Sequence, residues 1–204
     1  MLGNTVSITR FKAVDSAQVT DALVRQVPDL LKQYAFCPID KTAEERSFGW
    51  ANYDDQTDLE WLLSPPEKGE FITFGLRVDV RKIPASTMKL HVHQAVAKEL
   101  EQAKEQGKQF VSRDRKREIK EQVMLRLRAK TVPQPAFFPI VWAPSVNRIY
   151  LCGGSAKIIS MFMDYFQLTF EMPIEPLTGF FMAHEVLDDE QIEKVESLDP
   201  TIFI

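Results

Sequence analysis

Apolar residues recur along this chain with two periods, one typical of strands and one typical of helices. Alternating or short apolar runs predict strands over residues 6–13, 47–51, 71–80, 137–142, 148–152 and 179–183. Apolar residues three or four positions apart predict helices over residues 17–34, 85–105, 112–130, 156–167 and 188–197. We therefore predict an α+β protein in which mixed or antiparallel sheet elements support long helices.

Proline, glycine and serine residues mark several predicted boundaries. Asp15 or Ser16 would cap the first helix, and Pro28 would kink or restart it because proline lacks an amide hydrogen. Ser112 is a candidate cap for the third helix. The segment 153–155, Gly-Gly-Ser, fits either a tight turn that ends in a helix cap or a helix N-terminus that holds a phosphate, although the complete P-loop pattern is absent.

The composition is that of a globular protein with an apolar core. Of the 204 residues, 45% are hydrophobic, and 14 Phe and 3 Trp are available to fill the interior. We expect one elongated unit, residues 1–204, with possible sub-domains formed by residues 1–83 plus 135–204 and by residues 84–134. No apolar stretch reaches the length of a signal peptide or a membrane span, and Cys37 and Cys152 fit no metal-binding spacing. We therefore expect a cytoplasmic protein with free thiols.

Positive charge is concentrated in residues 108–130 of an otherwise acidic chain. This segment has nine basic and three acidic residues, a net charge of +6, whereas the whole protein has a net charge of −4. Ile119, Val123 and Leu127 recur four apart, so the predicted helix would bury one face and expose its charges. A local excess of Lys and Arg favours a polyanionic partner, since cations that neutralise phosphates gain affinity by counterion release.

Candidate DNA-binding side chains begin near the end of the strand 71–80 and continue through the basic helix. They are Arg77, Arg81, Lys82, Lys108, Arg113, Arg115, Lys116, Arg117, Lys120, Arg126, Arg128 and Lys130. No base-reading motif accompanies them, so they would hold phosphates without reading sequence. Two other interpretations stay open. The helix could be a solvated face held by pairs such as Arg117 with Glu121, and Arg77 and Arg81 could pair with acidic loops.

Several short matches over residues 1–170 are informative as a set. They are the strand after Met1-Leu2, Phe36 and Pro38, Gly49-Trp50, the Arg81-Lys82-Ile83-Pro84 step into a long helix, Leu100-Glu101, a strand that ends at Trp142, and Ser155-Ala156-Lys157. Together with the order of the predicted elements, they resemble the RdgC family of bacterial recombination-associated proteins. Family members are generally longer, so the resemblance predicts a short form with a reduced C-terminal part.

The resemblance implies a non-catalytic protein that binds double-stranded DNA with little sequence preference. It also implies a homodimer that closes as a ring around the duplex, is associated with the nucleoid, and restrains the recombinase RecA by occupying DNA. The reduced C-terminal part leaves the closure of the ring open here. At Lys130 many relatives have an aromatic residue at a subunit contact, which leaves dimerisation open as well. Independently of the resemblance, we expect no cofactor and no metal.

Other functions also remain open. The family has been labelled as exonucleases, and a metal-dependent nuclease would need converging carboxylates, for which the candidates are Asp54, Asp55, Asp58, Asp79 and Asp114. The basic helix could instead be a protein-interaction module that meets an acidic partner. His91 and His93 could share a metal only in an extended segment, because residues two apart on a helix diverge. Residues 164–204, with a charge of −9, could simply keep the protein soluble, or they could compete with DNA or contact another subunit.

Overall fold

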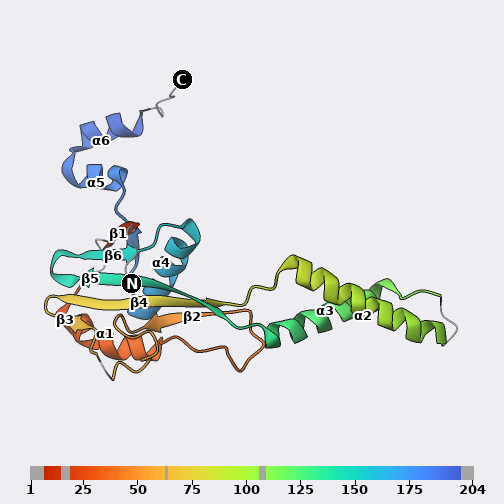
Figure 1. The fold of residues 1–204 in the computed structure, drawn as a ribbon. Helices are drawn as coiled ribbons and strands as arrows, with labels where there is room; N and C mark the ends of the chain where they lie inside the picture. Colours follow the sequence, from red (N-terminus) through yellow and green to blue (C-terminus); the bar gives the residue numbers. More distant parts are fainter. Residues whose placement is uncertain (1–6, 15–18, 63, 106–108, 199–204) are drawn as a thin grey trace. The chain divides into compact units, whose positions relative to one another are not determined.

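The computed structural model describes residues 7–14, 19–62, 64–105 and 109–198. Its strands are β1 (Ile8–Ala13), β2 (Arg46–Ala51), β3 (Glu67–Lys68), β4 (Phe71–Val80), β5 (Gln134–Ala143), β6 (Arg148–Cys152) and β7 (Ile174–Pro176). The described part of the chain has six α-helices, which are α1 (Asp21–Gln33), α2 (Ala85–Glu105), α3 (Arg113–Lys130), α4 (Ala156–Phe170), α5 (Gly179–Val186) and α6 (Asp189–Glu196) (Figure 1). The protein is therefore α+β, as predicted.

The strands form one seven-stranded sheet in the order β2-β4-β5-β6-β1-β7, with β3 paired to β4. The pairings of β1 with β6 and β7, of β3 with β4, and of β5 with β6 are antiparallel. The chain divides into two compact units. The sheet unit takes its described residues from 1–35, 50–76 and 138–204, and the hairpin unit takes them from 36–49 and 77–137. The hairpin unit thus includes a loop and strand ends outside the sub-domain 84–134 suggested by the sequence.

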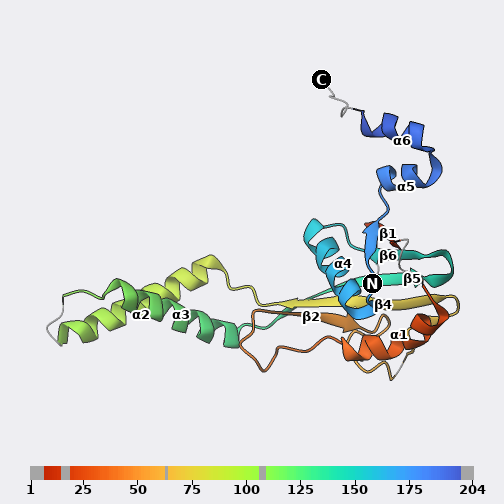
Figure 2. The same ribbon diagram turned by 180° about the vertical axis from the view of Figure 1, so that it is seen from behind.

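An aromatic core between the strands and α4 holds the sheet unit together. Phe162, Phe166 and Phe170 repeat every fourth residue of α4, and all three are buried. The ring centroids of Phe166 and Phe170 are 4.6 Å apart, and those of Trp142 and Phe166 are 5.5 Å apart. Trp50 packs against Phe162 and Phe170, and its Nε1 donates to Thr169 Oγ1 at 2.8 Å. Figure 2 shows α4 along the sheet that it covers.

Helices α2 and α3 pack side by side as a hairpin, visible in both ribbon views (Figures 1 and 2). The hairpin core is small and lacks aromatic rings. Its buried residues are Val111, Ile119 and Val123, which pack against the partly buried Met88, Val92, Ala95, Val96, Leu100 and Leu127. Ser112 caps α3 by accepting a hydrogen bond from the amide of Arg115, as the sequence predicts.

Most predicted elements are confirmed, with two differences: helix α1 begins later than predicted, and residues 179–183 are not a strand. Helix α1 begins after the cap Thr20, whose hydroxyl accepts from the amide of Leu23, and it continues through Pro28 without restarting there. The earlier candidate caps, residues 15 and 16, lie outside the described residues. Residues 179–183 belong to helix α5 and form no strand, because Thr178 caps the helix by accepting from the amide of Phe181. The two short strands β3 and β7 were not predicted.

Candidate nucleic-acid interface

Arg81, a predicted phosphate ligand, lies buried at the base of the hairpin and is 4% exposed. Its guanidinium donates to backbone carbonyl oxygens of Ile39, Asp40, Thr42, Glu44 and Thr131. The Nε–Thr131 O distance is 2.9 Å. This side chain fastens the loop before β2 to the residue that follows α3. We therefore assign Arg81 a structural role and leave it out of the interface proposed below.

Arg77 is also engaged inside the hairpin unit. Its Nε and Nη2 each donate to a carboxylate oxygen of Asp79 at 2.9 Å, and its guanidinium carbon lies 4.3 Å from the ring centroid of Phe36. Asp79 is only 2% exposed, so this ion pair is shielded from solvent. Lys82, the next predicted residue along the chain, is exposed.

The arginines of α3 differ in how far they are neutralised. Arg115 Nε donates to Glu99 Oε1 at 2.7 Å, and its Nη1 donates to Glu118 Oε2 at 2.8 Å. The hydrogen bond from Arg115 holds the pKa of Glu99 below its ordinary value, and both carboxylates raise the pKa of Arg115. Arg117 pairs with Glu121 at 3.4 Å, and Arg128 pairs with Glu45. Each of these three arginines would have to leave or share a carboxylate to bind a phosphate.

A second set of cations on the hairpin has no such neutralisation. Arg113, Lys116 and Lys120 are three and four residues apart and so share one side of α3. One side of the hairpin has a groove between α2 and α3. Lys89 and Lys104 of α2 lie about half a helical turn from the α2 residues that line this groove. They therefore lie on the other side of the hairpin, together with Arg113, Lys116 and Lys120. All five are exposed, and within the part of the chain that the structure describes they form no ion pair. We call these five residues the basic side.

The opposite side of the hairpin has a groove of about 570 Å³ with mixed polarity. It is lined by polar and charged groups of both helices, among them His91, Gln94, Lys98, Glu99, Gln122 and Arg126. Its cations face a carboxylate and several amides. On α3, by contrast, no Asp or Glu lies three or four residues from Arg113, Lys116 or Lys120. The α3 part of the basic side is therefore uniformly positive, whereas the groove contains groups of both charges.

The predicted site residues are thus only partly brought together. Arg113, Lys116 and Lys120 lie on the basic side, Arg126 lines the groove, and Lys130 is exposed at the end of α3. Lys108 lies outside the described residues. Lys89 and Lys104 were not predicted because they lie in α2, outside the dense basic segment 108–130. Their spacing relative to the apolar stripe of α2 was the available signal.

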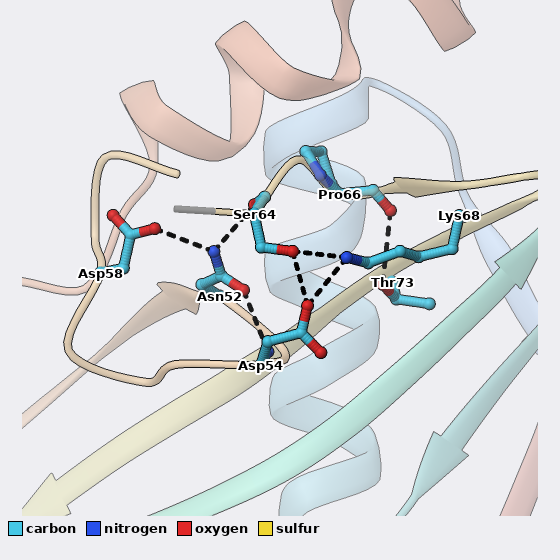
Figure 3. A network of polar contacts seen from close by, with 7 residues as sticks. All are labelled: Asn52, Asp54, Asp58, Ser64, Pro66, Lys68 and Thr73. Carbon is cyan, nitrogen blue, oxygen red and sulfur yellow. Dashed lines mark hydrogen bonds and ion pairs between the residues drawn. The ribbon is translucent and has the colours of Figure 1, made fainter. Parts of the chain in front are cut away.

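The loop carboxylates considered for a nuclease are held by the protein itself (Figure 3). Lys68 Nζ donates to Asp54 Oδ2 at 2.8 Å, and Ser64 Oγ donates to the same oxygen at 2.6 Å. These bonds, the one from Lys68 first, lower the pKa of Asp54. Asn52 Nδ2 donates to Asp58 at 3.1 Å and to the carbonyl of Ser64 at 2.9 Å. The network holds a surface loop in place. The Asp54 carboxylate, a candidate metal ligand for a nuclease, is already paired with the ammonium of Lys68.

The other candidate sites predicted from the sequence are the two histidines of α2, the two cysteines and the segment 153–155. His91 and His93 both lie in α2, and the described residues contain no group of three His, Cys, Asp or Glu side chains able to hold a metal. Cys37 and Cys152 are both free thiols. Ser155 caps α4 by accepting from the amide of Ile158, which fits the tight-turn interpretation of residues 153–155. Among the described helices, none combines the length and apolar character needed to cross a membrane.

No protein-family model matches this chain, and no curated protein matches it either. The resemblance to the RdgC family therefore rests on the sequence matches alone.

Proposed function

We propose that this protein binds double-stranded DNA without sequence preference and that the basic side of the hairpin holds the phosphates. The observation that carries the proposal is a set of exposed cations that form no ion pair with any described residue. They are Arg113, Lys116 and Lys120 on one side of α3, with Lys89 and Lys104 of α2. Free surface cations can replace the counterions of a polyanion without first breaking an internal ion pair.

The dimensions of the basic side suit a duplex. Arg113 and Lys120 are seven residues apart, which is about 10 Å along a helix axis. Duplex DNA carries roughly six phosphate charges over that length. The described side chains of the hairpin include no base-reading motif, so contacts to phosphate would dominate and sequence would matter little.

We also propose that the protein acts by occupancy. A homodimer would double the number of phosphate contacts and slow release, and DNA covered in this way would be less open to a recombinase such as RecA. This role in recombination at the nucleoid follows the RdgC resemblance, and the basic side supplies its physical basis. A dimer that encloses DNA would have twice the monomer mass and would bind longer duplexes more tightly.

Charge reversal tests the interface directly. We expect Arg113→Glu, Lys116→Glu and Lys120→Glu together to abolish duplex binding while the protein stays folded, because all three side chains are exposed. The matched control reverses Arg25, Lys32 and Lys157, which are exposed on helices of the sheet unit and change the net charge equally. The measurement is duplex affinity as a function of salt, with circular dichroism to confirm folding.

With six or more phosphate contacts per dimer, the wild type should lose on the order of 10³ in affinity between about 50 and 200 mM salt. Retained affinity in the folded triple variant, or an equal loss in the control, would refute the proposed interface. Weak binding that does not depend on duplex length would favour a protein-interaction module. Shortened products from labelled duplex with Mg²⁺ or Mn²⁺ would favour the exonuclease alternative.

A further inference from the structure

Phe110 stands out in the loop between α2 and α3 because its ring is 75% exposed. The residues that follow it are firmly placed. Val111 is 8% exposed and belongs to the hairpin core, and Ser112 caps α3. The backbone beside Phe110 is thus anchored while its side chain projects into solvent, which distinguishes it from an apolar residue on a loose loop.

The charges around this ring indicate what it would contact. Lys104 in the last turn of α2 and Arg113 at the start of α3 flank the loop, and both are exposed cations of the basic side. An aromatic ring at the end of a row of cations suits a ligand with both negative charge and flat apolar faces. Nucleic acid has both, and stacking of bases on aromatic side chains tolerates any base.

We infer that Phe110 stacks on an exposed base where a duplex is interrupted by a single-stranded gap, while the basic side holds the phosphates of the adjoining duplex. This inference rests on the proposed DNA binding and adds a preference for interrupted DNA. Inside an intact duplex each base face is covered by its neighbours, so the ring gains a contact only where a base face is open.

The test compares two closed-ended duplexes of equal sequence, one intact and one with a short single-stranded gap that carries 2-aminopurine. Closed ends are needed because a free duplex end also exposes a base face. We expect the wild type to prefer the gapped DNA by about tenfold or more and to quench the fluorescence of the modified base. Phe110→Ala and Phe110→Leu should lose both effects and keep the affinity for intact duplex. Phe110→Tyr, which keeps an aromatic ring, should retain both.

The outcomes separate this inference from the function on which it rests. If the wild type binds both DNAs equally well, the stacking role is wrong and DNA binding stands. If Phe110→Leu keeps the preference, the side chain acts as an apolar wedge and the stacking role is also wrong. If the wild type shows no preference but binds anionic vesicles through Phe110, the loop is a lipid contact. If neither DNA is bound, the proposed function itself fails.

Discussion

The sheet unit and the hairpin unit of this protein bury side chains in opposite ways. In the sheet unit, Trp50, Trp142, Phe11, Phe74, Phe162 and Phe166 are fully buried. The hairpin has a core of three buried aliphatic residues, and its 21-residue helix α2 has no buried residue at all. Large aromatic side chains remove far more apolar surface from water, so the sheet unit contains most of the hydrophobic stabilisation.

This difference shows how a small protein can place its large apolar core in one unit and a concentration of charged side chains in another. Helix α3 has eleven charged residues among its 18, and like charges gathered on one side of a helix repel one another. The small core of the hairpin must offset that repulsion with little apolar area. We therefore expect the hairpin to open locally at a lower free-energy cost than the core of the sheet unit.

The largest expected effect is the loss of an aromatic ring from the sheet unit. Phe166→Ala should lower the free energy of unfolding by about 4 kcal/mol, because the ring is fully buried among other rings and its removal leaves a cavity. Leu168→Ala on the same helix is the control, since Leu168 is 58% exposed and should change stability by less than about 0.5 kcal/mol. Denaturant unfolding measures both. Equal costs for the two variants would contradict the described core.

A smaller effect is expected in the hairpin. Ile119→Ala should cost about 2 kcal/mol, at the lower end for a buried aliphatic residue because the adjacent groove admits water. Hydrogen exchange should accelerate in α2 and α3 while the amides of α4 and its strands stay protected. Leu125→Ala, at a residue that is 54% exposed, is the control. Equal acceleration in both units would show that the hairpin does not open on its own.

The smallest expected effect concerns the ion pair of Glu99 with Arg115. The pKa of Glu99 in the folded protein lies below the ordinary value of 4.5, so its contribution to stability is present above pH 4.5 and is lost as the pH falls through the lower folded value. Glu99→Gln should therefore differ from the wild type near neutral pH and converge with it in acid. Glu101→Gln, at an exposed glutamate of the same helix, should show no such convergence. Thermal unfolding over a pH series measures both.

Local patterns were enough to predict the elements that an apolar stripe and a cap define together. The stripe of Met88, Val92 and Val96 and the cap Ser112 predicted the hairpin helices closely. The segment 179–183 was predicted as a strand because it is a short apolar run. It is helical in the structure, and the signal for a helix was the cap residue Thr178 just before it. Period alone cannot separate a buried strand from a short helix.

The candidate site was harder to predict because pairing depends on distant parts of the chain. The acceptors of Arg81 lie 37 to 50 positions away, so its burial left no local trace in the sequence. The partner of Arg128 is Glu45, which is 83 positions away. Spacing within one helix did indicate that Arg113, Lys116 and Lys120 share a side, but only the packing of α2 showed which other cations join them.

The contact of Arg81 with the carbonyl of Thr131 has a topological meaning. The chain leaves β4 and returns to β5 at one place, and these two strands are neighbours in the sheet. Residues 82–130 therefore form an insertion whose two ends lie close together, between neighbouring strands. Such a segment can be excised and replaced by a tight turn, or transplanted into the turn of another antiparallel strand pair, without stretching the strands on either side.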